Sequence, residues 1–589
     1  MPTSQQSQMV YSNASIGWFL AIFSLEALFI YNYLKNYWRG YLFGTLALVL
    51  VNLLGAYIPQ LIKTTIDTLQ DLDQKEFIQN SLILIVLLSI VMAIIRVYSR
   101  QVIFGIGRQI EFDLKKDIFN HVIKLQPSFF NQQKTGDLIS IMSNDVQALR
   151  GLGGFAMLNV INTFIAFVVI IPLMFKLHVA LTWCFLALIP SVLFFVFGLS
   201  AKIKFFQQKV QEKLGEMSNF LEANISGIHI VKAYAQEITE ITRFDFFNNS
   251  LKKDYISLVK VRSLIGPVMR VIASLGFVLL MYIGGQGIIS KSFTAGDFAA
   301  YSLYIQKLIW PVATLGWLVT IIYRAQVSYK RIEAILAVKP SIYDDPSAIN
   351  KTNFSDEITV PALDLKIKKG QNIAIIGTIG SGKSTLANKL MRLVDTNDNE
   401  VFIDNVDTKK ITLFSLRSLI NIVPQENFLF STSIHENIAY ARDLERAEVI
   451  RLAEMVCIHD EIMKLPEGYD SIVGERGVTL SGGQRQRLAI ARALAIDPEI
   501  LILDDALSSL DNESCEKILK NILDIRKSKT TIFITHKIKI VYNMDLILVM
   551  DKNQIIEQGN HKELYLKPNS LYRDLLLEAG LEGGLDEKS

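Results

Sequence analysis

Hydrophobic and polar positions divide the chain into two parts. Up to about residue 336 the apolar residues form long runs, and after residue 353 they form short runs separated by polar segments of helical spacing. A run of about 20 apolar residues is long enough to cross a bilayer as a helix. Six such runs are present, at residues 41–62, 80–103, 151–175, 179–197, 263–289 and 298–323. The pattern predicts an α-helical membrane domain of six spans, residues 41–336.

Two long connections between these runs are rich in Lys and Arg, at residues 108–150 and 202–262, whereas residues 67–76 and 176–178 are short or acidic. Basic connections stay on the cytoplasmic side under the positive-inside rule, so both termini are expected inside. Helical periodicity continues through both connections without clusters of Pro or Gly. Each is therefore expected to be a pair of helical extensions that carry the spans beyond the membrane.

The N-terminal segment, residues 1–40, contains an apolar stretch at 16–30. This stretch is short, is interrupted by Glu26, and has neither a basic region before it nor a small-residue cleavage site after it, so it does not resemble a signal peptide. Together with the aromatic and basic residues 31–39 it predicts an interfacial helix along the membrane. An additional membrane crossing is the alternative.

The second part of the chain has the pattern of a soluble domain. Residues 337–353 contain two prolines and little apolar periodicity, which is typical of a linker. Residues 354–577 alternate apolar strands with helical patterns, which predicts an α/β fold with parallel strands. Residues 578–589 are polar and are expected to be a frayed tail.

Composition agrees with this division. A chain of 589 residues is too long for one core, and half of its residues are hydrophobic, with a mean hydropathy of +0.31. Such values are rare for a soluble enzyme of this size. The net charge of +3 gives no argument for a nucleic-acid partner, and we expect none. The three cysteines show no metal-ligand spacing or obvious pairing and suggest a reducing compartment.

A specific chemical motif is IAIIGTIGSGKSTL, residues 373–386. An apolar strand runs into a Gly-rich turn, and Lys383 opens a helical segment. Gly377, Gly380 and Gly382 allow backbone conformations that other residues avoid, so that successive N–H groups can point at the phosphates of a nucleotide. Lys383 supplies a charge, and Ser384 places a hydroxyl where Mg²⁺ needs a ligand. The motif predicts a P-loop that binds ATP and Mg²⁺.

A second strand, ILILDD at residues 500–505, delivers Asp504 at its carboxyl end. A carboxylate in this position can hold Mg²⁺ beside the phosphate cradle. Taken alone, the strand would be read as a core strand that happens to end in two acids. The P-loop upstream favours the metal-binding interpretation.

Further motifs follow in a fixed order: VPQEN around Gln425, GERG at 474–477, LSGGQ at 480–484, SSLD at 508–511 and THK around His536. With these motifs the whole chain resembles the ATP-binding cassette (ABC) family, and six spans before one cassette resemble an exporter-type half-transporter. Residues 129–146 and 227–237 resemble the cytoplasmic helices of that family. Among its members, the chain is most similar to the bacterial multidrug-resistance-like half-transporters of the Mdl type.

The resemblance implies an α/β cassette with a helical subdomain, and two cassettes that meet head to tail. Each ATP would then lie between the cradle of one chain and the LSGGQ signature of the other. It also implies an exporter in a bacterial-type plasma (inner) membrane, with a cytoplasmic cassette, a second half-transporter as partner, and a lipid-like or amphipathic substrate.

Residue roles follow from the same resemblance. The catalytic group is expected to comprise Asp505, Gln425 and His536, and the metal ligands Ser384, Gln425 and Asp504. The nucleotide contacts are expected from Gly377, Thr378, Ile379, Gly380, Ser381, Gly382, Lys383, Ser384, Thr385, Ser481, Gly482, Gly483, Gln484 and Asp511.

One departure from the family pattern concerns catalysis. The family places a glutamate after the metal-binding aspartate, and this chain has Asp505. A side chain one methylene shorter withdraws its carboxylate by about 1.5 Å, enough to spoil a hydrogen bond to water that must close to roughly 3 Å. Hydrolysis at this cradle is expected to be slow, while the signature is intact. This combination favours a heterodimer; the alternatives are a homodimer with a slow Asp505 base, or a cassette protein that regulates another membrane protein.

Two points remain open in the sequence. The adenine-stacking aromatic has no convincing position, and Tyr343 and Phe354 are the nearby candidates. Polar residues inside the apolar runs are expected mainly to bond across helices, and they show no cluster of like charges. They are Asn52, Gln60, Asn159, Asn162, Arg270, Gln286 and Gln306.

Overall fold

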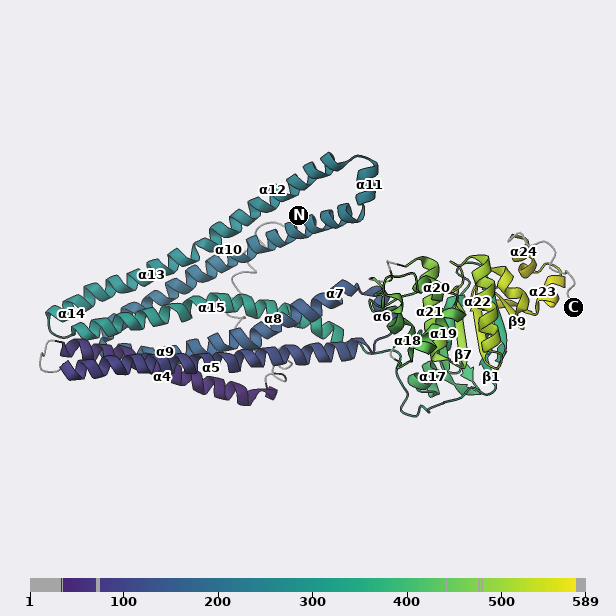
Figure 1. Cartoon of the computed structure of the whole chain (residues 1–589). Helices are drawn as coiled ribbons and strands as arrows, with labels where there is room; N and C mark the ends of the chain where they lie inside the picture. The colour runs from purple at the N-terminus through teal and green to yellow at the C-terminus, as the bar shows by residue number, and fades with distance from the viewer. Residues whose placement is uncertain are drawn as a thin grey trace. The chain divides into compact units, whose positions relative to one another are not determined.

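A computed structural model describes residues 33, 35–69, 75–440, 442–474, 477 and 480–578. The expected interfacial segment at 16–30 and most of the polar tail at 578–589 lie outside these residues. The chain forms two compact units. One comprises residues 1–123 and 134–338, and the other comprises residues 124–133 and 339–589. Figure 1 shows that the first unit is made of helices and the second contains the strands.

The helical unit consists of long helices joined by short turns (Figure 1). Its segments are α4 (Trp38–Thr68), α5 (Lys75–Val122), α7 (Thr135–Ser140), η2 (Ile141–Asp145), α8 (Val146–Gly151), η3 (Leu152–Ala156), α9 (Met157–Leu177), α10 (Val179–Ser226), α11 (Ile228–Ala233), α12 (Glu237–Ser263), α13 (Ile265–Leu279), η4 (Leu280–Gly284), α14 (Gly285–Ile289) and α15 (Ala295–Leu336). The expected helical extensions are present, because α5, α10 and α15 continue well beyond their apolar stretches.

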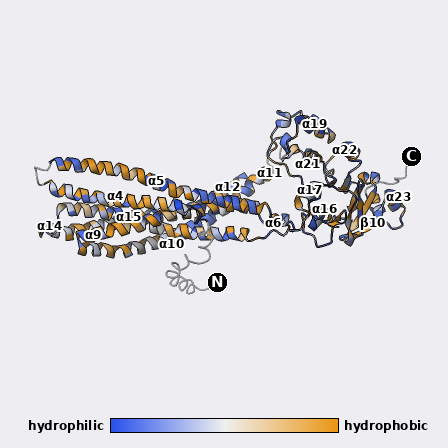
Figure 2. Cartoon of the chain, turned by 90° about the horizontal axis from the view of Figure 1, so that it is seen from below, coloured by the Kyte–Doolittle hydropathy of each residue, from blue (hydrophilic) through white to orange (hydrophobic). Residues whose placement is uncertain are grey.

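Among the residues that the structure describes, four helical runs are long and apolar enough to cross a membrane: Trp38–Thr68, Lys75–Val122, Thr135–Leu177 and Ala295–Leu336. They contain the first, second, third and sixth predicted spans. The fourth and fifth predicted spans fall on α10 and on α13 to α14, where the apolar stretches Val179–Ser191 and Ser274–Ile289 are shorter. Figure 2 shows hydrophobic residues predominating along α4, α5 and α9. The count of six spans therefore stays a prediction.

Polar contacts fasten the helices to one another. The Asn52 side chain of α4 donates to the Asn162 side chain of α9 at 3.0 Å, as expected for polar residues that bond across helices. At the other end of α4, Asp67 accepts hydrogen bonds from the Thr294 hydroxyl and the Gly296 N–H. Thr294 also caps α15. These bonds hold the end of α4 against the start of α15.

The second unit contains two sheets. The smaller, antiparallel sheet has the order β2-β1-β4-β5, with β1 (Glu357–Val360), β2 (Leu365–Lys368), β4 (Phe402–Ile403) and β5 (Val406–Asp407). The larger has the order β10-β9-β3-β8-β7-β6, with β3 (Asn372–Gly377), β6 (Ile420–Val423), β7 (Ile500–Asp504), β8 (Thr530–Ile534), β9 (Leu546–Asp551) and β10 (Gln554–Gly559). All pairs of the larger sheet are parallel except β9 with β10. The predicted α/β fold with parallel strands is confirmed.

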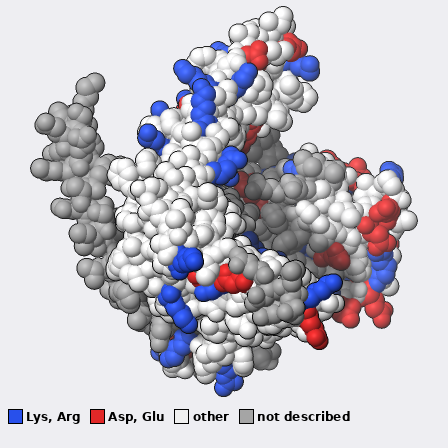
Figure 3. All heavy atoms as spheres, turned by 90° about the vertical axis from the view of Figure 1, so that its left-hand side faces the viewer, with Lys and Arg blue, Asp and Glu red and all other residues white. Residues whose placement is uncertain are grey.

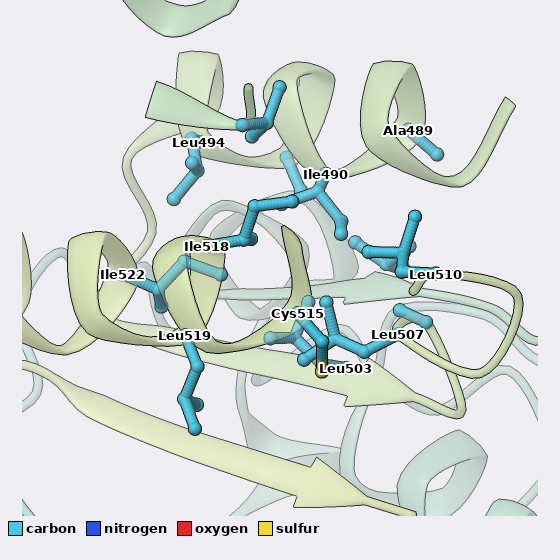
Figure 4. Close-up of a cluster of buried hydrophobic side chains, with 14 of the residues drawn as sticks. Ala489, Ile490, Leu494, Leu503, Leu507, Leu510, Cys515, Ile518, Leu519 and Ile522 are labelled. Carbon is cyan, nitrogen blue, oxygen red and sulfur yellow. The ribbon is translucent and has the colours of Figure 1, made fainter. Parts of the chain in front are cut away.

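Helices pack around this sheet. They are α16 (Lys383–Leu390), α17 (Leu413–Leu419), α18 (Ile434–Ala439), α19 (Arg446–Met455), α20 (His459–Ile462), α21 (Gly482–Ile496), α22 (Asn512–Ile525), α23 (His561–Leu566) and α24 (Leu571–Glu578). In Figure 4, Ile490 and Leu494 of α21 face Ile518 and Ile522 of α22, with Leu503 of β7 in the same cluster. Burial of these apolar side chains stabilises the position at which β7 ends.

The segment of residues 124–133 belongs to the second unit, which contains the strands, although it lies between α5 and α7 in the sequence. It contains α6 (Pro127–Gln132), which begins with Pro127 at a position where a missing N–H costs nothing. The side-chain oxygen of Gln126 accepts a hydrogen bond from the Ser341 N–H at 3.1 Å. This segment corresponds to part of the stretch that resembles the family's cytoplasmic helices.

Arg526 is the largest fully buried side chain of the described residues, with 1% of its surface exposed. Its guanidinium donates to the Pro498 carbonyl, the Thr530 carbonyl and the Thr531 hydroxyl. Burial lowers its pKa to about 10, so it stays charged at neutral pH. Arg526 thus ties the end of α22 to the starts of β7 and β8.

Replacement of Arg526 by Met is expected to destabilise the cassette by roughly 2–4 kcal/mol, because buried acceptors lose their donors. Urea unfolding and hydrogen exchange of the β8 amides measure the effect. Lys527→Met is the matched control, because the Lys527 side chain is 77% exposed. Equal stability of the two variants would contradict this role.

Candidate functional site

The predicted motifs follow neighbouring parallel strands. Strands β3, β8, β7 and β6 lie side by side in this order, and their carboxyl ends share one edge of the sheet. The Gly-rich turn follows β3, His536 follows β8, Asp505 follows β7 and Gln425 follows β6. A shared carboxyl edge is the usual position of ligand sites in open α/β sheets. The topology therefore gathers these residues, which are far apart in sequence.

The turn after β3 has the backbone that the motif predicts. Gly377, Gly380 and Gly382 have φ values of +147°, +80° and +95°, and α16 begins at Lys383. A Cβ on Gly377 would lie 2.0 Å from the Met550 carbonyl oxygen, and a Cβ on Gly382 would lie 2.3 Å from the side-chain oxygen of Asn553. Gly377 is required by space as well as by conformation, because the contact is with backbone, whereas at Gly382 the Asn553 side chain would have to move.

Lys383 is buried at the start of α16, with 7% of its surface exposed. Its ammonium donates to the carbonyls of Gly377 and Thr378 and to the Ser381 hydroxyl, at 3.0, 2.8 and 3.3 Å. Burial lowers the pKa of Lys383, and Asp504 and Asp505 oppose that shift by attraction. The charge lies inside the turn, where a phosphate group would be held.

The other predicted residues of the turn differ in exposure. Ser381 is buried, with its hydroxyl bonded to Lys383, while Thr378, Ile379, Gly380, Ser384 and Thr385 are exposed. The Thr378 hydroxyl donates to Asp551 at 3.0 Å. Ile379 is 93% exposed. This edge of the turn is open to a ligand.

Asp504 lies at the end of β7 with 6% of its surface exposed. Burial is the main cause that raises its pKa, and a hydrogen bond with Ser384 and the charges of Lys383 and His536 oppose the shift. A buried carboxylate bonded to a serine hydroxyl offers the hard oxygen ligands that Mg²⁺ prefers. The pair of side chains therefore fits the predicted metal.

Asp505 has a left-handed backbone, with φ of +50°. Its Oδ1 atom is enclosed and has no hydrogen-bond partner among the described residues. Its backbone N–H donates to the Ile534 carbonyl of β8 at 2.8 Å. The Oδ1 atom of Asp505, next to Asp504 in sequence, could therefore still accept a hydrogen bond.

Gln486 holds the loop after β7, and sequence reasoning missed this residue. Its side-chain oxygen accepts from the Ser509 N–H at 3.0 Å, and its amide donates to the Ser508 hydroxyl at 3.0 Å. Gln486 lies on the helix that follows the signature, so it couples that helix to the loop containing Asp505 and Asp511. No spacing rule in the sequence marks it.

The signature begins α21. The Ser481 hydroxyl accepts from the Gln484 N–H, and the Gln484 side chain accepts from the Ser481 N–H, which forms a capping box. Glu461 of α20 accepts from the Gln484 amide at 2.8 Å and pairs with Arg487 at 2.7 Å. Glu461 is a second residue that the sequence did not indicate. It fixes the rotation of the signature helix.

Some predicted site residues have no hydrogen bond to the Gly-rich turn among the described residues. Gln425 is exposed in the turn after β6, and Asp511 is exposed and caps α22 through the Ser514 N–H. Among the described residues, the hydrogen bonds and ion pairs of Ser481 and Gln484 do not reach the Gly-rich turn. Gly482 and Gly483 lie against Ser509. Within the described part of the chain, no hydrogen bond or ion pair thus links these two signature residues to the turn.

Comparison with known proteins decides the family. Residues 41–312 match the model of the ABC transporter transmembrane region, and residues 360–508 match that of the ABC transporter. The multidrug resistance-like ATP-binding protein MdlA of Buchnera aphidicola is 30% identical over 90% of this chain and 95% of its own length. The chain belongs to the ABC transporter family.

Other ABC relatives agree. The probable multidrug resistance ABC transporter ATP-binding/permease protein YheI of Bacillus subtilis is 29% identical over 92% of this chain and 95% of its own. An ATP-dependent lipid A-core flippase of Desulfotalea psychrophila is 32% identical over 78% and 83%. The structure of a bacterial Atm1-family ABC exporter with ATP bound matches with a TM-score of 0.77 at 25% identity, covering 92% of this chain and 99% of that one. The chain thus has the layout of an ABC exporter half-transporter, a multi-pass membrane protein with an ATP-binding domain.

The two candidates for the adenine-stacking aromatic, Tyr343 and Phe354, differ in exposure. Phe354 is completely buried in the core below the smaller sheet, so its ring is not available for stacking. Tyr343 is 64% exposed. Of the two candidates, only Tyr343 can offer its ring to a nucleotide.

Asp504→Asn is expected to raise the thermal midpoint of the nucleotide-free ABC protein by a few °C. The pKa of Asp504 is raised in the folded state, so ionisation destabilises the fold, and this penalty grows as pH rises through the folded pKa. In a domain of this size, each 1 kcal/mol of relief raises the midpoint by roughly 2–4 °C. Differential scanning fluorimetry near pH 7.5 measures the shift.

Asp511→Asn serves as the control with the opposite sign. Hydrogen bonds from Ser514 lower the pKa of Asp511, so its ionised form stabilises the fold and the amide is not expected to raise the midpoint. A lower midpoint for Asp504→Asn would show that its charge is already compensated.

Proposed function

We propose that this chain is one half of an ATP-driven exporter that moves an amphipathic or lipid-like molecule across a bacterial plasma (inner) membrane. The relatives named for multidrug resistance and for lipid A-core flipping support this class of cargo. The basic cytoplasmic connections support a cytoplasmic cassette. ATP and Mg²⁺ are its cofactors, and the bilayer and a second half-transporter are its partners.

In the proposed assembly, two cassettes form two composite sites. The turn at 377–385, with Asp504, would hold the nucleotide and its metal, and Mg²⁺ would neutralise the phosphate charge there. The α21 N-terminus, with Ser481, would face the nucleotide of the other chain, because capped helix N-termini attract anions. The bonds of Ser481 and Gln484 to their own helix and to Glu461, with none to the turn among the described residues, agree with this division of roles.

The observation that carries the proposal of a heterodimer is Asp505. Its position after β7 is that of the family's catalytic glutamate, and its side chain is one methylene shorter. The signature helix, in contrast, is fully capped and is held by Glu461. We propose that this chain contributes the signature to an active site on its partner, and that its own cradle holds ATP with little hydrolysis.

The test compares two substitutions in the assembled pair. Asp505→Asn is expected to change steady-state ATP turnover less than about threefold, whereas Gln for the partner's glutamate is expected to lower it at least about 100-fold. The isolated chain is expected to show little ATPase activity. Fast hydrolysis by a purified homodimer would instead favour the alternative of a slow but sufficient Asp505 base.

A cassette protein that regulates another membrane protein would share the same ATP site. Proteoliposomes with outward-facing cassettes separate the two functions. ATP-dependent uptake of an amphipathic dye, lost in the partner's Glu→Gln variant, is expected for an exporter. ATP hydrolysis without any uptake across a panel of such dyes would favour regulation.

A further inference from the structure

Two cations lie together inside the helical unit although the sequence separates them widely. Lys307 is on α15, about 18 Å along the helix from Ala295 at ~1.5 Å per residue. Arg96 is on α5, within the apolar stretch of that helix. The apolar layer of a bilayer is about 30 Å thick. Lys307 therefore lies well inside the layer that α15 would cross.

The two side chains meet around Gly55 of α4. The Lys307 ammonium donates to the Gly55 carbonyl. A Cβ on Gly55 would lie 3.2 Å from that ammonium and 3.5 Å from the Met92 sulfur. The Arg96 guanidinium lies 3.6 Å from the same sulfur. Lys307 thus contacts Gly55, and Arg96 contacts Met92, which lies beside Gly55.

The charges repel each other and lack a counter-ion. Lys307 and Arg96 are close enough to interact as like charges, and Arg100 adds a third positive charge near Arg96. The sequence contains no Asp or Glu at 38–66, 77–110, 146–211, 264–296 or 298–332. Among the described residues neither cation has an acidic partner. Figure 3 shows broad areas of uncharged residues between separate charged side chains on the face that it presents.

Most of the hydrogen-bonding capacity of the pair is unspent. An ammonium has three N–H donors and a guanidinium has five. Within the described part of the chain, the hydrogen-bond partners of these two groups are one carbonyl and one thioether sulfur, which is a weak acceptor. Lys307 is half-buried and Arg96 is exposed, so the donors of Arg96 face outward from this chain. Charged residues at bilayer depth are costly unless they are paired, and they mark ligand sites.

We infer that Arg96 and Lys307 together bind the anionic group, a phosphate, carboxylate or sulfonate, of an amphipathic molecule. This rests on the proposed export function and narrows its cargo class to acidic amphiphiles. The planar Arg96 suits two oxygens of one anion, and Lys307 adds a point charge. Trp310, one turn from Lys307 and 73% exposed, offers an apolar surface for the tail.

The sequence-based expectation that no like charges cluster in the membrane is corrected here, because the cluster forms only when α4, α5 and α15 pack together.

The experiment measures binding without nucleotide, so it does not depend on ATPase activity or transport. The assembled transporter in phosphatidylcholine nanodiscs is titrated with dansylaminoundecanoic acid and with its methyl ester, followed by dansyl fluorescence. The acid is expected to bind about tenfold more tightly than the ester. Lys307→Met and Arg96→Met are each expected to remove this difference, and Lys307→Arg to retain it. Arg270→Met, at another exposed cation within an apolar helix, is the matched control and is expected to leave it unchanged.

A second arm identifies the source of the anion. If phosphatidylglycerol in the nanodisc weakens binding of the acid to the native protein but not to Lys307→Met, the site holds the headgroup of a resident lipid. If it has no effect, the anion belongs to the cargo. Equal affinity for acid and ester, or a difference that survives both charge removals, would overturn the inference. Failure of the export proposal would instead leave binding intact while ATP-driven uptake is absent.

Discussion

Ser481→Arg is expected to lower ATP turnover of the assembled transporter at least about 100-fold. Ser481 is exposed at the start of α21 and caps that helix through the Gln484 N–H. Arginine removes the cap and places a bulky side chain on the surface proposed to meet the partner's nucleotide. Turnover of the purified pair is measured together with photolabelling of each chain by azido-ATP. Labelling of this chain's own cradle is expected to persist.

Ser528→Arg makes the same chemical change elsewhere. Ser528 is exposed just before β8, at the amino edge of the sheet, so this variant is expected to turn over ATP normally. Ser481→Arg with activity within threefold of the native pair would show that the signature does not take part in the partner's site.

Gly377→Ala is expected to weaken ATP binding at this chain's cradle by about 100-fold or more. The new Cβ would lie 2.0 Å from the Met550 carbonyl oxygen, at a φ of +147° that L-residues rarely adopt. The clash is with backbone, so the end of β3 must move away from β9. Photolabelling of this chain at rising concentrations of azido-ATP measures the loss.

Gly380→Ala is the control within the same turn. It also has positive φ, at +80°, but a Cβ there meets no atom within 4 Å. Conformational strain alone costs about 1–3 kcal/mol, so a smaller loss of affinity is expected. Similar affinities for the two variants would mean that the contact with Met550 is not what requires Gly377. Hydrogen exchange in β7 checks that the cassette remains folded in both.

The Gly-rich turn shows what local sequence can predict. Gly377, Gly380 and Gly382 were predicted to adopt backbone conformations that other residues avoid, and their positive φ values agree with this. The residues of the predicted spans also fall on helical segments, because a long apolar run predicts a helix from local sequence alone. Asp504 was correctly expected at the carboxyl end of a strand, since a buried apolar run fixes where that strand ends.

Contacts between distant segments could not be predicted in this way. Strand β8 lies between β3 and β7, and only that insertion brings His536 within electrostatic range of Asp504. Glu461 and Gln486 act through side-chain bonds to the signature helix and to the loop after β7. Glu461 belongs to no motif, and Gln486 lies in LSGGQRQR but had no predicted role. Arg96 and Lys307 lie in two apolar runs that are far apart in sequence, and the sequence analysis assigned neither a role. In each case tertiary packing decides which residues meet, and this packing cannot be predicted from a single sequence.

The ten-residue segment 124–133 has a practical consequence for work on the separate domains. A protein truncated to begin at Lys339 would contain every ATP-binding motif but would lack a piece of its own folding unit. The Ser341 N–H would lose its partner on Gln126. Such a fragment is expected to be less stable than its motifs suggest. Joining residues 124–133 to the fragment through a flexible linker is the better design for expression.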